Sequence, residues 1–84
     1  MGIVSYRSLS KNRRRALILQ TLRPLIAGRA MDEKELIAHL WGRAVHVSGW
    51  LGRTHLRRDL NALRKLGTVQ RLAHASAPLW YRKT

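Results

Sequence analysis

Leucines recur at helical spacing in the second half of the chain, and this pattern constrains the fold more than any other feature. Leu56, Leu60 and Leu63 fall on one side of a helix when residues are placed about 100° apart. Gly67 follows the pattern, and glycine is typical of the position just after a helix. We therefore expect an amphipathic helix over about residues 54–66, with its leucines buried against the rest of the chain.

A helix is also expected near the N-terminus. It begins near Arg13, with Ser10 or Asn12 as its N-cap, and Pro24 should kink or end it. Gly28 closes this segment. The apolar stripe of this helix comprises Ile18, Leu22, Leu25 and Ile26.

The middle of the chain has the clearest helix start. Asp32 and Glu35 have the spacing of a capping box, and Gly42 is expected to stop the helix. The apolar face of this helix comprises Leu36, Ile37, Leu40 and Trp41. Ser48 is a further possible N-cap, so the start of the third helix is left open between Ser48 and Thr54.

Two short strands are expected after the third helix. They cover 68–73 and 79–82, with a turn at 74–78, and would form a hairpin. The predicted fold is therefore mainly α with a small β-hairpin. The order of three helices and a two-stranded wing resembles that of a winged helix-turn-helix domain. We expect a basic N-terminal arm at 1–12 and this domain at 13–84.

The charge of the chain indicates a polyanionic partner. Lys and Arg number 17 against 4 Asp and Glu, for a formal net charge of +13. Residues 1–29 hold seven basic residues and no acid, and residues 48–84 hold eight basic residues and one acid. Arginine, which accounts for thirteen of the 17, suits phosphates and guanine edges. Nucleic acid is the favoured partner, ahead of an anionic membrane surface or an acidic protein.

Several function classes lack their motifs. The chain has no cysteine, which excludes a disulfide framework and a cysteine-ligated zinc site. The four histidines match no common zinc spacing, and neither a phosphate-binding loop nor a nucleophile motif is present. The longest uncharged stretch, 72–81, is too short to cross a membrane. We expect a cytoplasmic, nucleoid-associated protein that is not an enzyme and takes no cofactor or metal.

One run of residues carries a family resemblance. The run THLRRDLNAL at 54–63, with Gly67, Val69 and Arg71 after it, resembles the DNA-binding module of DeoR-type bacterial repressors. The recognition helix of that family reads T-hydrophobic-R-R-D-L-x-x-L, and His55 is an additional residue here. The 84 residues do not cover the large effector domain of those repressors, so we expect no small-molecule effector from this resemblance. Small phage and plasmid regulators are the nearer analogy for size.

The resemblance implies a DNA interface on the third helix and the wing. Asp59 is expected to orient its neighbours rather than to touch DNA. The expected contacts on the third helix are Arg53, Thr54, His55, Arg57, Arg58, Asn61 and Lys65. The expected phosphate contacts on the wing are Arg71, Arg82 and Lys83, and those near the N-terminus are Lys11, Arg13, Arg14 and Arg15.

These residues predict a regulator, most simply a repressor, that binds double-stranded DNA. A homodimer is plausible, because one small module reads only a few base pairs. Trp41 is expected in the core, whereas Trp50 and Trp80 either pack or contact the partner. Two alternatives stay open, namely a basic RNA-binding or ribosome-associated protein and a winged helix that binds protein.

Overall fold

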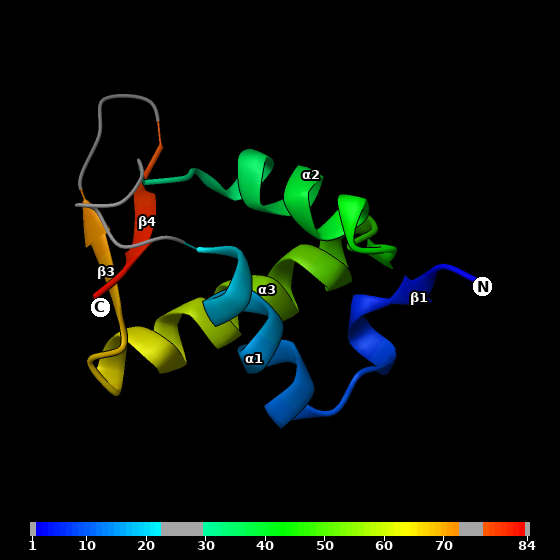
Figure 1. Cartoon of the computed structure of the whole chain (residues 1–84), viewed down its shortest axis with the longest axis horizontal. Coiled ribbons are helices and arrows are strands. Elements are labelled where there is room, and N and C mark those ends of the chain that lie inside the picture. The colour runs from blue at the N-terminus through cyan, green and yellow to red at the C-terminus, as the bar shows by residue number, and fades with distance from the viewer. Residues whose placement is uncertain (1, 23–29, 73–76, 84) are drawn as a thin grey trace.

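Three α-helices and a small antiparallel sheet form most of the described chain, as the sequence predicts (Figure 1). The computed structural model describes residues 2–22, 30–72 and 77–83. The elements in chain order are β1 (Val4–Ser5), the 3-10 helix η1 (Tyr6–Ser8), α1 (Lys11–Thr21), α2 (Glu33–Gly42), β2 (Val45–His46), α3 (Gly49–Lys65), β3 (Val69–Leu72) and β4 (Leu79–Arg82).

Helices α1 and α2 both have a predicted N-cap, Ser10 being one of the two alternatives for α1, although α1 begins at Lys11 rather than near Arg13. The side-chain hydroxyl of Ser10 accepts a 3.3 Å hydrogen bond from the N–H of Arg13, and Asp32 Oδ1 accepts one of 2.8 Å from the N–H of Glu35. Helix α1 ends at Thr21, ahead of Pro24. The expected continuation of its apolar stripe at Leu25 and Ile26, together with Pro24 and Gly28, lies outside the described residues.

Helix α2 ends at Gly42, as predicted, but Gly42 does not supply the left-handed turn that follows. Gly42 is the last helical residue, and the left-handed backbone falls two residues later at Ala44, whose φ is 61°. Trp41 was expected in the core, but this was wrong because its side chain is 51% exposed. The buried face of α2 consists of Leu36 and Leu40. Trp41 lies beside that face and makes an edge contact with the His46 ring, with centroids 4.9 Å apart.

Helix α3 settles the open question of where the third helix starts. It begins at Gly49, directly after Ser48, whose side chain makes no capping bond. The predicted C-terminal glycine is confirmed: Gly67 has a φ of 84°, and its N–H donates to the carbonyl of Arg64. The next N–H, that of Thr68, donates to the carbonyl of Leu63. These two bonds complete a Schellman cap, which turns the chain directly into β3.

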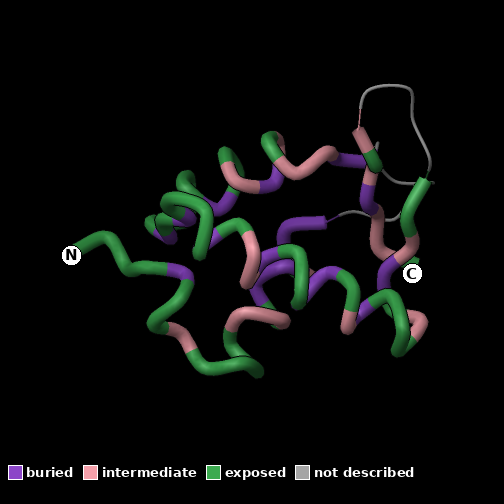
Figure 2. The backbone as a smooth tube through the Cα atoms, turned by 180° about the vertical axis from the view of Figure 1, so that it is seen from behind, coloured by how far each residue is buried: buried purple, intermediate pink, exposed green. Residues whose placement is uncertain are grey.

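The core lies between the three helices. The helix sides that face one another are buried, and the outer sides are exposed (Figure 2). Leu56 and Leu60 are fully buried, and Leu63 is nearly so, which confirms the predicted face of α3. The remaining core residues are Tyr6, Leu17, Ile18, Leu22, Met31, Leu36, Leu40, Val45, Val47, Val69 and Trp80.

The predicted hairpin is present and is attached to the helical body. Strands β3 and β4 pair antiparallel, with Val69 opposite Arg82 and Leu72 opposite Leu79. Met31, just before α2, forms an isolated bridge with Trp80 through two backbone hydrogen bonds of 2.7 and 2.8 Å. Trp80 itself is buried, so the hairpin is anchored by both its backbone and a large core side chain.

The N-terminal segment packs against the domain, which differs from the expectation of an arm over 1–12. Strand β1 pairs in parallel with β2, and Val4 lies opposite Val45. Tyr6 is fully buried in the core. Strand β1 lies at the opposite end of the molecule from the hairpin (Figure 1). The lack of periodicity in these residues reflects a short extended segment rather than an unpacked one.

Candidate nucleic-acid interface

The side of α3 that faces away from the leucines is polar and basic. Because Leu56, Leu60 and Leu63 fix one side against the core, residues about half a turn away must face solvent. Those on the outer side are Thr54, Arg57, Arg58, Asn61 and Lys65; Thr54 is half-buried and the other four are exposed. The structure therefore brings these five sequence-predicted residues onto one surface. His55 is half-buried at the border of this surface.

Most polar groups of this surface are available to a partner. Within residues 2–22, 30–72 and 77–83, the side chains of Arg58, Asn61 and Lys65 have no hydrogen bond or ion pair. Thr54 differs, because its hydroxyl donates a 2.8 Å bond to the carbonyl of Trp50 in the preceding turn. Its oxygen can still accept a bond from outside.

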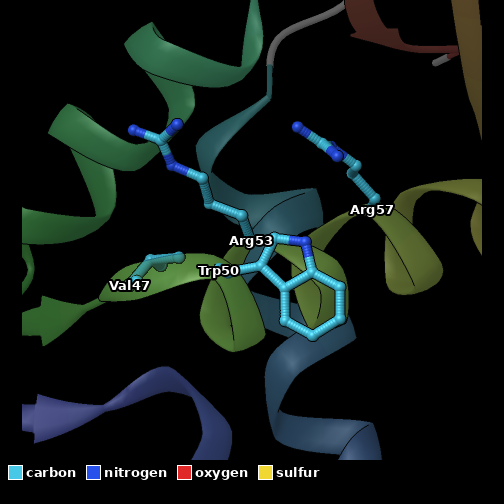
Figure 3. Close-up of a pocket in the computed structure, with 5 residues that line it drawn as sticks. Val47, Trp50, Arg53 and Arg57 are labelled. Atoms are coloured by element: carbon cyan, nitrogen blue, oxygen red, sulfur yellow. The ribbon is translucent and has the colours of Figure 1, made fainter.

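A hollow of about 360 Å³ lies at the first half of α3. Trp50, Arg53 and Arg57 line it from the helix, and Val47 lines it from the preceding loop (Figure 3). Trp50 is 75% exposed and therefore does not pack in the core. An aromatic face beside two guanidinium groups can bind a planar or an anionic group.

A second hollow, of about 330 Å³, joins α3 to the hairpin. Asn61 and Arg57 line it from α3, Glu33 from the start of α2, and Arg71 and Trp80 from the hairpin. Arg57 therefore borders both hollows. The surface between α3 and the hairpin is therefore concave and can fit against a convex partner.

Arg57 is held by an acid on the neighbouring helix. Its Nε donates a 2.8 Å hydrogen bond to Glu33 Oε2. This bond raises the pKa of the Arg57 guanidinium above its usual value, so the group stays charged. The Arg57 side chain is nevertheless 57% exposed, and that of Glu33 is 24% exposed.

The wing cations differ in what they can reach. Arg71 is exposed and lies over the Trp80 ring, with its Cζ 5.8 Å from the ring centroid, and Lys83 is exposed. Arg82 was expected to contact phosphate, but its Nη1 donates a 3.0 Å bond to the carbonyl of Leu19 and its Nε is buried. Arg82 therefore joins β4 to α1. Of the predicted turn at 74–78, residues 74–76 lie outside the described part.

The four N-terminal cations also divide into two groups. Lys11 and Arg13 are exposed at the start of α1. The Nε of Arg14 donates a 2.8 Å bond to Asp59 Oδ2, which raises the pKa of Arg14, and its Nη1 donates to the carbonyl of Leu9. Arg14 therefore points into the protein, and its side chain is only 16% exposed. Arg15 is half-buried, and its Nε is buried with no hydrogen-bond partner among the described residues.

Tyr6 is a third member of the Asp59 cluster, and the sequence did not indicate it. Its phenol donates a 2.6 Å bond to Asp59 Oδ2, and burial followed by this bond raises the Tyr6 pKa far above its usual value. Asp59 is 4% exposed. As the sequence predicted, it orients its neighbours, although these lie on η1 and α1 rather than on α3.

The described ranges contain neither a metal-binding cluster nor a membrane-spanning helix. No group of three His, Asp or Glu side chains there lies close enough together to hold a metal ion. None of the helices there combines the length and the apolar character that a bilayer span requires.

Comparisons of the chain with protein-family models, with curated proteins and with solved structures give no match.

Proposed function

We propose that this chain is a winged helix-turn-helix protein that binds double-stranded DNA and regulates transcription, most simply as a repressor. The observation that carries the proposal is the outer side of α3, where Arg57, Arg58, Asn61 and Lys65 are exposed together. A single α-helix fits the major groove of B-DNA, which is about 12 Å wide. Asparagine can form a bidentate pair with adenine, and arginine can do so with guanine.

The hairpin supports the same orientation of the molecule on DNA. Its attachment at Met31 and Trp80 holds it beside α3, with a hollow between them. Arg71 and Lys83 are exposed on the hairpin side and would contact the phosphate backbone flanking the groove. In this proposal, the hairpin is the wing of the domain, and α2 and α3 form the helix-turn-helix.

The start of α1 supplies further phosphate contacts. Lys11 and Arg13 are exposed there, on a helix that has no acid in its first turn. The N-terminus of a helix attracts anions through its free N–H groups and its dipole. With Arg14 and Arg82 turned inward, we assign these contacts to the exposed cations alone. A homodimer on a two-fold site would extend the few base pairs that one module reads.

Single-stranded nucleic acid is a second candidate, because the Trp50 ring is exposed beside Arg53 and Arg57. Such a ring can stack with an unpaired base of RNA or of single-stranded DNA. The duplex proposal remains the stronger one, since it also accounts for Arg58, Asn61 and the hairpin.

Selection of bound duplexes from a random pool tests the proposed function. We expect enrichment of a defined sequence of several base pairs, and competition by that duplex at much lower concentration than by duplex RNA or single-stranded RNA. A pool that stays random, with RNA as the better competitor, would contradict the proposal and favour the second candidate.

A further inference from the structure

We propose that Arg57 and Glu33 act together to read a guanine, with Arg57 as the base-contacting residue and Glu33 as the residue that positions it. This inference rests on the proposed function, because it identifies the base that one part of the α3 surface would recognise. It concerns an ion pair between two helices that the sequence pattern did not connect.

The geometry leaves the reading end of Arg57 free. Its Nε is bonded to Glu33 Oε2 at 2.8 Å, and its two terminal nitrogens have no hydrogen-bond partner within the described ranges. A guanidinium bonded through Nε presents these two terminal groups side by side. That spacing matches the O6 and N7 acceptors of guanine in the major groove.

The charge of Glu33 favours a base edge over a phosphate. A carboxylate next to the arginine partly cancels its attraction for an anionic phosphate, whereas O6 and N7 are neutral acceptors. Glu33 is one of only 4 acidic residues in the chain. Of the others, Asp32 caps α2 and Asp59 is buried against Tyr6 and Arg14. Glu33 therefore places a negative charge on an otherwise basic surface, next to the arginine that borders both hollows.

The bond to Glu33 also prepares Arg57 for binding. A free arginine side chain has many rotamers, and ordering it on DNA costs conformational entropy. Because Glu33 restricts the side chain before binding, less of that cost remains at the moment of contact. The expected consequence is a stronger preference for one base, not a stronger affinity for all sequences.

The test uses the full chain and a duplex selected by the wild-type protein. Each G·C pair of this duplex is replaced in turn by A·T. At each position, the affinity for the selected duplex is divided by the affinity for the substituted duplex. This affinity ratio is measured for wild type, Arg57→Lys, Glu33→Ala and Glu33→Gln. For wild type, replacement of the guanine that Arg57 contacts should lower the affinity roughly 5- to 100-fold. Arg57→Lys keeps the charge but lacks the planar fork, so its ratio at that one guanine should fall below that of wild type while the ratios at other guanines stay unchanged.

Glu33 should affect the same guanine and no other. Glu33→Ala should lower the ratio there while leaving the affinity for a scrambled duplex equal or higher, since a negative charge is removed. Glu33→Gln keeps an acceptor oxygen and should restore part of the ratio. Lys34→Gln, at the exposed neighbouring position, should retain the full ratio, and thermal unfolding of every variant checks that the fold is intact.

The outcomes separate this inference from the proposed function. The inference is wrong if Arg57→Lys lowers the affinity ratio at no guanine, or if Glu33→Ala keeps the full ratio. Either result would leave the proposal of duplex binding by α3 unchanged. Failure of the wild-type protein to select any duplex would overturn both. Replacement of the same guanine by 7-deazaguanine, which lacks the N7 acceptor, should weaken wild type but not Arg57→Lys.

Discussion

The phenol of Tyr6 donates a 2.6 Å hydrogen bond to Asp59 Oδ2, joining η1 to α3 across 53 positions of the sequence. The same carboxylate oxygen accepts a 2.8 Å bond from Arg14 Nε on α1. Asp59 is the only one of its helix's charged residues that is buried within the described part. The cluster therefore fixes the rotation of α3 about its own axis, and with it the side of the helix that faces solvent.

The cluster should contribute more to stability than the exposed ion pair does. Asp59→Ala leaves the half-buried Arg14 guanidinium and the buried Tyr6 phenol without their acceptor, so we expect a loss of about 2–4 kcal/mol in the free energy of unfolding. Glu33→Ala is the matched control, because it breaks an ion pair whose arginine is exposed and should cost less than about 1 kcal/mol. Denaturant unfolding measures both. Equal losses would mean that Asp59 does not anchor the fold.

Tyr6 should make stability depend on alkaline pH. Its pKa in the folded protein lies above the value of about 10 that it has in the unfolded chain, because burial and the bond to Asp59 disfavour the phenolate. The contribution of Tyr6 is therefore complete below pH 10 and is lost as the pH rises above that value.

Tyr6→Phe isolates this effect. At neutral pH it should lower the free energy of unfolding by roughly 1–3 kcal/mol, because the bond to a charged acceptor is lost. Between about pH 10 and 12 the difference between wild type and Tyr6→Phe should shrink. Chemical unfolding across this range measures it. A constant difference would show that the phenol does not titrate on unfolding.

The elements of the fold were predictable where the signal is local. Ser10, Asp32 and Gly67 each act within one turn of their own helix, so the sequence spacing alone identified them. The leucine side of α3 and the two hairpin strands follow from short-range periodicity in the same way. Trp41 shows the limit of this reasoning, because it lies at the edge of an apolar stripe and tertiary packing decided its exposure.

The roles of the cations were less predictable, because each depends on a distant partner. Arg13, Arg14 and Arg15 are identical in the sequence pattern, but only Arg14 meets a carboxylate 45 residues away. Likewise, Arg82 is next to the exposed Lys83 but bonds to the backbone of α1. The Glu33–Arg57 pair also needs the packing of α2 against α3. The distribution of basic residues along the sequence predicted a basic surface, but it did not identify which of these residues lie on that surface.

Trp50 should contribute to binding but not to folding. Its ring is 75% exposed, so Trp50→Ala should change the free energy of unfolding by less than about 0.5 kcal/mol. Loss of an aromatic contact with a base or a sugar should weaken nucleic-acid binding by roughly 1–3 kcal/mol. Trp41→Ala is a matched control, being an exposed tryptophan away from the outer side of α3. Similar binding losses in both variants would contradict a specific role for Trp50.

Salt should weaken the complex steeply. If five to eight phosphates are neutralised by the exposed cations, the logarithm of the association constant should fall with the logarithm of salt concentration at a slope of roughly −4 to −7. Titrations of one duplex at several salt concentrations measure this slope. A flat response would leave phosphate contact without support.

The central claim is that α3 reads sequence while other cations hold the backbone, and Arg58 and Lys11 test it most directly. Arg58 is exposed on the outer side of α3, and Lys11 is exposed at the start of α1.

The measurement is a pair of titrations, on a selected and on a scrambled duplex at one salt concentration, for wild type, Arg58→Ala and Lys11→Ala. Arg58→Ala should lose roughly 1–3 kcal/mol on the selected duplex and narrow the gap between the two duplexes. Lys11→Ala should weaken both equally and leave the gap intact. If Arg58→Ala weakens both duplexes equally, or changes neither while remaining folded, Arg58 does not read the groove and the account of α3 is contradicted at that residue.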